Sequence, residues 1–375
     1  MGSDVGRVQE AIRDETLGLA DAAAERRILE GVSRTFALTI PALPDELRDV
    51  VTNGYLLCRI ADTIEDDPGL PVDRKERFHR EFHEAVIGER DPVPLAAALA
   101  RELTQRPLPA ERELIRAMPL VIRVTRSFGE RQAAAISRCV RIMCEGMSRY
   151  QTGRGGRGLR DIEELHAYCY HVAGVVGEML TELFCEHSPE IAARRSELEA
   201  RAVSFGQGLQ MTNILKDVWD DLDRGFCWLP RDVFARAGFD LRDLVRGQRV
   251  DSGRFRRALG ELIALAQAHL RDALEYVLLI PARQGGIRRF CLSALFMALL
   301  TLRKIDRRRG FGSSREVKIS RRSVRASIAA ANLLTGSDIA LRALFALASL
   351  GLPKSESFEK ENGWTRERLR GGAPS

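Results

Sequence analysis

Apolar residues recur along most of this 375-residue chain at the three- and four-residue spacing of an amphipathic helix, whereas the two-residue alternation of β-strands is scarce. Ala, Leu, Arg and Glu dominate, and aromatic residues make up only 6% of the sequence. This composition favours helices over strands. The pattern therefore predicts an all-α protein, and its 45% hydrophobic content is ample for a core.

The breaks in this pattern give the expected elements. Asp45 is expected to cap a helix that runs to Pro68. A proline-punctuated connector is expected from Pro92 to Pro109. The other predicted helices span residues 73–89, 111–150, 161–190, 193–223, 254–280, 284–306 and 319–350. Because the loops between them are short, we expect one large helical domain over residues 31–352, after an amphipathic segment over 1–30 and before a polar, disordered tail over 353–375.

Composition narrows the setting. The seven cysteines are scattered without C-x-x-C spacing, which predicts buried thiols in a reducing compartment. The first residues carry charges and no apolar signal region, so a cytoplasmic protein is expected. The longest late apolar run, Ala343 to Leu352, is about half the length of a membrane span, which argues against a spanning anchor. Peripheral contact with the inner face of a membrane through this run stays open.

Two short acidic clusters carry the most informative chemistry. Residues 62–67 read Asp-Thr-Ile-Glu-Asp-Asp, and residues 217–221 read Asp-Val-Trp-Asp-Asp. On a helix, Asp62, Glu65 and Asp66 share one face, and so do Asp217 and Asp221. Like charges so placed cost roughly 0.2–0.5 kcal/mol per pair, which a divalent cation would reverse. Oxygen ligands suit Mg²⁺, whose coordination substrate phosphates often complete. The pattern predicts a magnesium-diphosphate site.

Basic side chains flank both clusters. Arg59 lies one helical turn before Asp62 and can hold a diphosphate oxygen, as can Arg34 from the preceding segment. Lys216 and Arg224 lie on either side of the second cluster. One acidic cluster alone is about as often an exposed helix end with ordinary ion pairs, but two clusters with neighbouring cations favour a shared site.

These residues stand in motifs that resemble those of the squalene and phytoene synthases, the head-to-head prenyl transferases of the isoprenoid synthase fold. The resemblance covers roughly residues 30–330. Its motifs are Ser33-Arg34-x-Phe36, Tyr55-x-x-x-Arg59-x-x-Asp62-x-x-Glu65-Asp66, Tyr168-Cys-x-x-Val172-Ala-Gly174-x-Val-Gly177 and Gln210-x-x-Asn213-x-x-Lys216-Asp217-x-x-x-Asp221. The resemblance implies a single helical domain around a central cavity, where both acidic motifs hold Mg²⁺ against the diphosphates of two farnesyl diphosphate molecules.

Carried over residue by residue, the resemblance implies these roles. The catalytic residues would be Tyr168, Asp62, Asp66, Asp217 and Asp221. The metal ligands would be Asp62, Glu65, Asp66, Asn213, Asp217 and Asp221. Substrate would contact Ser33, Arg34, Phe36, Tyr55, Arg59, Gln210, Asn213, Lys216, Arg224 and Phe290. Lys216 replaces the family's usual arginine, which keeps the charge and loses the bidentate geometry. The order Tyr170-His171 is reversed from the family's usual order, so the roles of these two residues stay open.

A basic stretch from Arg303 to Arg325 holds ten Lys or Arg residues and two acidic ones, which is typical of an anion site or a solvated edge. Its Val317-Lys-Ile-x-Arg321 segment resembles the nicotinamide-cofactor loop of reductive squalene synthases. The resemblance implies that NADPH contacts Lys318, Ser320, Arg321 and Arg322. The implied activity is condensation of two farnesyl diphosphates to presqualene diphosphate, followed by NADPH-dependent reduction to squalene. The alternative is condensation without reduction, to dehydrosqualene or phytoene.

Other functions fit the sequence less well. His79 and His83 share a helix face, but Glu81 is misplaced for a metalloprotease and no third ligand is apparent. The sequence pI of about 9.1 permits nucleic-acid binding, but the basic stretch lacks interleaved aromatic residues, so no nucleic-acid partner is expected. A membrane-associated scaffold without catalysis is the third alternative. It would tolerate loss of both acidic clusters.

Overall fold

The computed structural model describes residues 20–33, 35–104, 108–151, 158–244, 250 and 252–355. Over these residues the regular elements are helices. A single isolated parallel β-bridge pairs Leu159 with Pro230. The all-α prediction is confirmed. Arg34 and residues 356–375 of the predicted tail lie outside the described residues.

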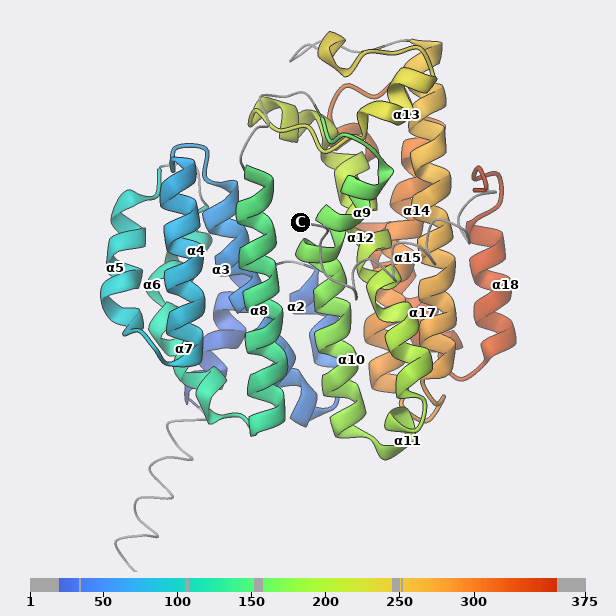
Figure 1. Ribbon diagram of the computed structural model, residues 1–375. Coiled ribbons are helices and arrows are strands. Elements are labelled where there is room, and N and C mark those ends of the chain that lie inside the picture. Colours follow the sequence, from blue (N-terminus) through green and yellow to red (C-terminus); the bar gives the residue numbers. More distant parts are fainter. Residues whose placement is uncertain are drawn as a thin grey trace, which may run out of the picture. The chain divides into compact units, whose positions relative to one another are not determined.

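The chain divides into two compact units, residues 1–148 (the N-terminal unit) and 149–375 (the C-terminal unit). In the N-terminal unit, a helix over residues 20–32 precedes the labelled helices of Figure 1. These are α2 (Phe36–Thr39), η1 (Ile40–Ala42), α3 (Asp45–Asp66), α4 (Val72–Ile87), α5 (Pro92–Glu102), α6 (Pro109–Arg116), α7 (Met118–Ser127) and α8 (Glu130–Gln151), whose last turn crosses into the second unit.

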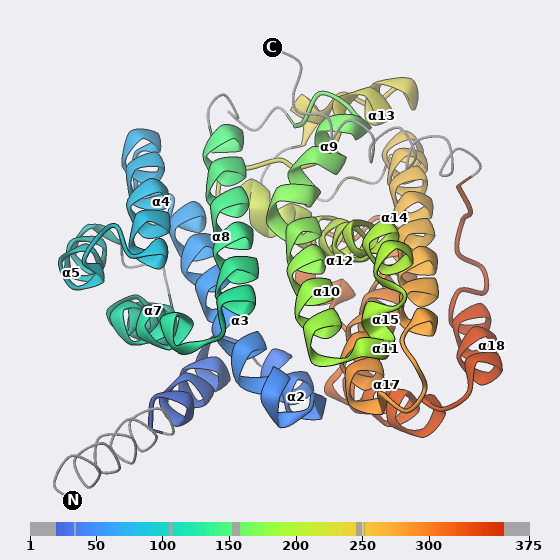
Figure 2. The same cartoon turned by 60° about the horizontal axis from the view of Figure 1, so that its bottom comes forward.

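Helix α3 is the centre of the N-terminal unit and lies between α4 and α8 (Figures 1 and 2). Its inner face is apolar, and Leu56, Ile60 and Ile64 are fully buried. His79 on α4 hydrogen-bonds the Ala61 carbonyl through Nε2 at 3.1 Å. The helix over residues 20–32 adds a buried polar contact, described below. Most of α3 is therefore held by neighbours, as expected of a long core helix.

Helices of the C-terminal unit surround α12 and α14, which pack along each other (Figure 1). The elements of this unit are α9 (Ile162–Cys169), the π-helical turn η2 (Tyr170–Gly174), α10 (Val175–His187), α11 (Pro189–Ala192), α12 (Arg195–Asp223), α13 (Arg231–Arg236), η3 (Leu241–Asp243), α14 (Gly253–Leu279), α15 (Gly285–Arg307), α16 (Ser314–Val317), α17 (Arg321–Leu334) and α18 (Asp338–Ala348).

Several predicted helices were too long. The predicted helix over 111–150 is three helices, α6, α7 and α8. Pro119 falls in the first turn of α7, where a proline fits, but it would break a continuous helix by removing a hydrogen bond and clashing with the preceding turn. The predicted helix over 319–350 is α17 and α18, because Ser337 caps a new helix by accepting a hydrogen bond from the Ala340 amide.

The proline-punctuated connector from Pro92 to Pro109 contains the helix α5, capped by the Asp91 side chain on the Val93 amide at 2.9 Å. Two smaller predictions also need correction. Asp45 does not cap α3: it is the first helical residue, and Pro44 precedes it. The predicted helix over 161–190 is interrupted by the π-helical turn η2. Such turns are frequent at functional sites.

Helix α12 lies unusually close to α10 and to the turn η2 at two glycines. A Cβ atom at Gly177 of α10 would lie 2.1 Å from the Ala202 carbonyl oxygen of α12, and one at Gly206 of α12 would lie 2.1 Å from the Ala173 carbonyl oxygen of η2. Both contacts are with backbone, which cannot move aside as a side chain can. Only glycine fits at either position, so main-chain contacts set how closely α12 packs against α10 and η2.

Two sequence predictions about burial can be checked here. All seven cysteines are buried free thiols, as expected. Helix α15 is long and apolar enough to cross a membrane, but 72% of its most apolar window is buried inside the protein. That burial is typical of a core helix.

Candidate active site

The first acidic patch, defined here as Asp62, Glu65 and Asp66, lies in the last two turns of α3. Asp62 is partly exposed, with 34% of its side chain accessible, and Asp66 is exposed. Glu65 is buried. The i, i+4 spacing puts Asp62 and Asp66 on one face, as the sequence predicted.

Arg59 is held between two carboxylates. Its Nη1 lies 3.6 Å from Asp62 Oδ2, and its Nη2 donates to Glu111 Oε1 on α6. Glu111 is itself fixed, since its Oε2 accepts a hydrogen bond from the Leu108 amide at 2.8 Å. Sequence analysis missed Glu111. It comes from a different helix 52 residues away, and no local pattern links it to Arg59.

The electrostatics of this patch favour an added cation. The pKa of the Asp62 carboxyl is raised to about 7, mainly by desolvation and in part by the neighbouring Asp66, against the lowering effect of Arg59. Burial disfavours the charged Arg59 guanidinium, but Asp62 and Glu111 outweigh that effect and raise the Arg59 pKa. The Arg59 guanidinium thus pairs with two carboxylates, Asp62 and Glu111, so it compensates the negative charge of Asp62 only in part.

Three further predicted residues gather beside Arg59. The Tyr55 and Phe36 rings pack with centroids 4.8 Å apart. Ser33 lies close enough to the Tyr55 side chain to lower its pKa, and the Ser33 hydroxyl accepts a hydrogen bond from the Phe36 amide at 3.1 Å. Burial raises the Tyr55 pKa, and Arg59 and Asp62 are close enough to affect it too. The structure therefore brings together the described members of the first two motifs.

The second acidic patch, defined here as Asp217, Asp220 and Asp221, ends α12. Lys216 Nζ lies 2.8 Å from Asp217 Oδ2, and Arg224 Nη2 pairs with Asp221 Oδ1. Only 8% of the Asp221 side chain is exposed, against 30% for Asp217. Each acid of this pair has a basic residue from the same stretch of chain beside it.

Earlier turns of α12 carry the other residues predicted in this motif. Asn213 is exposed one turn before Asp217, and Gln210 is half-buried one turn before Asn213. Their spacing places them along the same side of the helix as Asp217. Phe290, predicted to contact substrate, is buried in α15.

An aromatic cluster surrounds Tyr168. Its ring stacks on Trp228 with centroids 3.8 Å apart and packs edge-on against Tyr150 at 5.4 Å. Phe226 continues the stack beyond Trp228 at 5.8 Å. Sequence analysis singled out Tyr168 alone, because the two rings from the segment after α12 meet it only in three dimensions. Stacked rings present electron-rich faces that attract cations.

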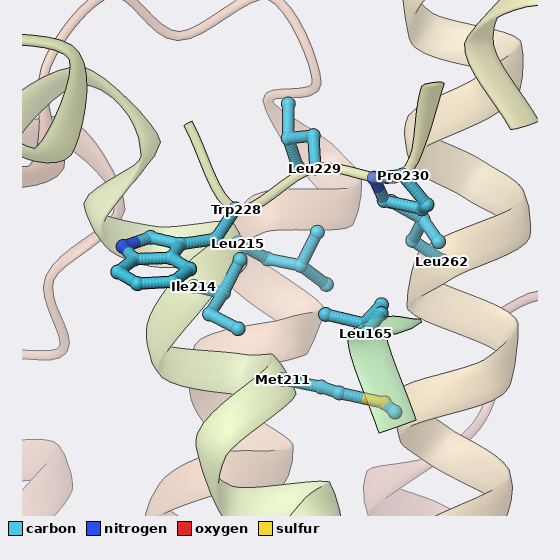
Figure 3. A pocket seen from close by; sticks show the side chains of 8 residues that line it. All are labelled: Leu165, Met211, Ile214, Leu215, Trp228, Leu229, Pro230 and Leu262. Carbon is cyan, nitrogen blue, oxygen red and sulfur yellow. The ribbon is translucent and has the colours of Figure 1, made fainter. Parts of the chain in front are cut away.

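Behind Trp228 is a small apolar cavity of about 10 Å³ (Figure 3). It is lined by Leu165, Met211, Ile214, Leu215, Trp228, Leu229, Pro230 and Leu262. A space of this size holds no more than about one water molecule. The cavity is a packing gap behind the α12 motif, too small for a prenyl chain.

The predicted cofactor segment is exposed at the start of α17. Ser320 caps that helix, accepting a hydrogen bond from the Ser323 amide at 3.1 Å. Lys318, Arg321 and Arg322 are exposed, and none of the three side chains forms an ion pair with the described residues. Several uncompensated cations at a helix N-terminus suit a phosphate group.

The donor atoms fit magnesium as a cofactor. Among the described residues, no three His, Cys, Asp or Glu side chains are grouped closely enough to hold a metal ion by themselves. Each patch does offer two carboxylates on one helix face, of which Asp221 is largely buried, and oxygen-only donors are what Mg²⁺ prefers. Mg²⁺ keeps several waters and takes substrate phosphates as ligands, so it does not need three protein ligands from one patch.

Comparison with known proteins gives one consistent result. The family model described as squalene/phytoene synthase matches residues 29–323. The squalene synthase of Schizosaccharomyces pombe is 28% identical over 341 residues, which cover 89% of this chain and 70% of the yeast protein. The Homo sapiens squalene synthase is 29% identical over 276 residues, covering 74% of this chain and 61% of the human protein.

Solved structures show the same fold. The complex of TcSQS with the ligand BPH1237 has a TM-score of 0.68 and 22% identity, and the match covers 94% of this chain and 98% of that one. A dehydrosqualene synthase in complex with ligand has a TM-score of 0.63 and 20% identity, covering 85% of this chain and 98% of that one. At these identities the likeness concerns the fold.

Proposed function

The chain belongs to the squalene/phytoene synthase family, and we propose that it condenses two farnesyl diphosphates to presqualene diphosphate and reduces that intermediate to squalene. The observation that carries the proposal is the pair of acidic patches, each on its own helix with basic side chains beside it. The relatives described above are named squalene synthases, which favours this activity over condensation without reduction.

In the condensation, the two patches act on diphosphate. Asp62 and Asp66 on α3, and Asp217 and Asp221 on α12, would hold Mg²⁺, which would supply a Lewis acid for the departing diphosphate. Arg59 contacts the same anion as a bidentate donor, for which its clamp with Glu111 fixes the guanidinium plane. Stabilising the leaving group in this way lowers the barrier to allylic cation formation.

The aromatic cluster then acts on the cation. The double bond of one farnesyl chain attacks the allylic carbon of the other, and a proton is lost as the cyclopropane ring closes. The rings of Tyr168 and Trp228 have apolar, electron-rich faces, which stabilise positive charge and keep water away from it. The released diphosphate accepts the proton, and the Tyr168 hydroxyl assists its transfer.

The reduction uses the basic segment. Lys318, Arg321 and Arg322 would bind NADPH through its phosphates. Held there, the cofactor would supply the hydride that converts the rearranged carbocation to squalene. A cation that formed and received no hydride would lose a proton and yield dehydrosqualene. Reductant therefore decides the product.

The proposed product, squalene, is insoluble in water, and this bears on where the protein acts in the cell. We propose a cytoplasmic protein that contacts the membrane through α18, whose outer face exposes Ile339 (83%), Leu347 (64%) and the following Leu350 (71%). Arg303 donates to the Leu347 carbonyl at 3.4 Å, so a basic group lies at the end of this face. Apolar side chains beside cationic ones suit an anionic lipid surface, into which a hydrocarbon can pass directly.

The decisive experiment is product analysis. Purified protein is incubated with radiolabelled farnesyl diphosphate and Mg²⁺, with and without NADPH. We expect presqualene diphosphate to accumulate without NADPH and squalene to form with it. If the protein makes the same hydrocarbon under both conditions, it is a dehydrosqualene or phytoene synthase and the reductase assignment is wrong.

A further inference from the structure

Two adjacent residues of α12 bind the segment that leads to the cofactor residues. The Trp219 indole Nε1 donates to the Phe311 carbonyl oxygen at 2.7 Å, in a fully buried contact. The Ser314 hydroxyl donates to Asp220 Oδ2 at 2.7 Å. These side chain contacts join parts of the chain that are 92 and 94 residues apart.

The contacts use a different side of α12 from the metal-binding residues. Successive residues of an α-helix are rotated by about 100°, so Trp219 points roughly opposite to Asp217 and Asp221. Asp220 lies between the two directions. The helix therefore presents carboxylates on one side and holds residues 311–314 with another. A shift of α12 would move both.

Hydrogen bonds continue along the held segment up to the cofactor residues. The Gly312 amide donates to Glu316 Oε1 at 3.0 Å, and Ser313 caps the short helix α16 through the Arg315 amide. Val317 is fully buried. Lys318 follows at once, and its amide donates to the Ser314 carbonyl at 2.9 Å. The position of Lys318 thus depends on where Ser314 is held.

We propose that Trp219 and Ser314 are positioning residues for the reductive step, which fix the cofactor segment Lys318–Arg322 relative to the metal-binding face of α12. This inference rests on the proposed function. Diphosphate departure at Asp217 and Asp221 creates the cation, and the hydride must reach that cation before it loses a proton. A rigid link between the two binding elements keeps the hydride donor at a constant distance from the leaving group.

The inference predicts a split between the two half-reactions. Condensation does not use NADPH. Removing either hydrogen bond of the link should therefore leave the rate of presqualene diphosphate formation within about twofold of the parent protein's rate. The loss of one hydrogen bond typically corresponds to a change of about two- to tenfold. We expect the apparent KM for NADPH to rise by that factor and dehydrosqualene to increase at the expense of squalene.

Ser314→Ala and Trp219→Phe test the link, alone and combined. Ser314→Ala removes the hydroxyl donor with little change in volume, and Trp219→Phe keeps an aromatic ring but removes the indole N–H. Ser327→Ala is the matched control, because within the described part of the chain the Ser327 hydroxyl donates to the Ser323 carbonyl of its own helix, α17. Thermal unfolding of each variant separates loss of folding from loss of alignment. Ser314→Thr, which keeps a hydroxyl, should restore the NADPH dependence of the parent protein.

The outcomes are distinct. A raised KM for NADPH with more dehydrosqualene, in both link variants but not in the control, supports the inference. Equal loss of both half-reactions, or no change in either, overturns it. If the unsubstituted protein ignores NADPH altogether, the proposed function fails first. If that protein responds to NADPH and the link variants behave like it, only the present inference fails.

Discussion

On α3, the basic group beside the acidic patch is fixed by a neighbouring helix, whereas on α12 the basic groups belong to the same stretch of chain. Arg59 is shared between Asp62 and Glu111 of α6. Lys216 and Arg224 each pair with an acid within three residues. The same chemical groups therefore depend on tertiary packing in one region and on local sequence in the other.

The difference teaches where each patch is vulnerable. A change in α6 reaches the first patch through Glu111, although Glu111 belongs to neither motif. In the second patch Lys216 and Arg224 pair with acids of the same stretch of chain, and through Trp219 and Asp220 this stretch is bound to the segment before the cofactor residues. The first patch is therefore held by a neighbouring helix, whereas the helix of the second patch itself holds another segment in place.

The largest effect should come from the acids themselves. Asp62→Asn and Asp217→Asn each remove a charge expected to hold Mg²⁺, and we expect a loss of about a hundredfold or more in condensation rate, with helical content unchanged. Presqualene diphosphate formation across a Mg²⁺ titration is the measurement. Asp49→Asn on α3 and Glu197→Gln on α12 are controls, because both acids sit in exposed ion pairs. Near-normal rates at saturating Mg²⁺ would rule out the shared site.

The dependence of α3 on its neighbours should also appear in stability. Glu25 is buried, and its Oε1 accepts a hydrogen bond from Asn53 Nδ2 of α3 at 2.7 Å. Desolvation raises the Glu25 pKa to about 8, although the Asn53 contact lowers it. The unfolded chain loses this proton near pH 4.5, so the folded state binds one more proton between those values. Stability should therefore fall as pH rises from about 4.5 to 8.

Glu25→Gln keeps the acceptor and removes this titration. We expect its stability relative to the parent protein to increase between pH 5 and pH 8 by about 1–3 kcal/mol and then to level off. Urea unfolding at several pH values measures the difference. Glu30→Gln, at an exposed position of the same helix, should show no such trend. A constant difference at all pH values would contradict the raised pKa.

The clamp on Arg59 should matter next. Glu111→Gln removes one of the two charges that hold the guanidinium, and a lost charge-assisted contact is worth roughly 1.5–3 kcal/mol in a buried setting. Because the site is partly exposed, we expect about a tenfold rise in KM for farnesyl diphosphate. The exposed Glu113 on the same helix gives the control Glu113→Gln. Equal kinetics in the two variants would mean that Glu111 only caps α6.

The smallest effect should come from exchanging Lys216 of α12 for arginine. Lys216→Arg keeps the charge beside Asp217 and adds a second donor, so we expect condensation rates within about threefold of the parent protein. Lys216→Ala should cost more, about tenfold, because the charge is lost. Steady-state kinetics with farnesyl diphosphate check both. Equal losses in the two variants would show that the shape of lysine, and not its charge, is required.

The same contrast explains how far sequence analysis reached. Helices α3, α12, α14 and α15 were predicted closely, because their apolar periodicity is long and uninterrupted. The acidic patches were found because each lies on one helix. Glu111, Trp228 and the contact between Trp219 and Phe311 were missed, since each joins distant parts of the chain. Helix breaks at Pro119 and Ser337 were missed because apolar periodicity continues across them.

The close approach of α12 to α10 at Gly177 and to η2 at Gly206 sets a limit on how this protein can be re-engineered. Side chains that line the small cavity behind Trp228, such as Met211 and Leu215, can be exchanged to enlarge or fill that cavity. The distance from α12 to α10 and η2 cannot be tuned in that way, because main-chain atoms already touch. A library aimed at new product lengths should therefore leave both glycines unchanged and vary the residues around them.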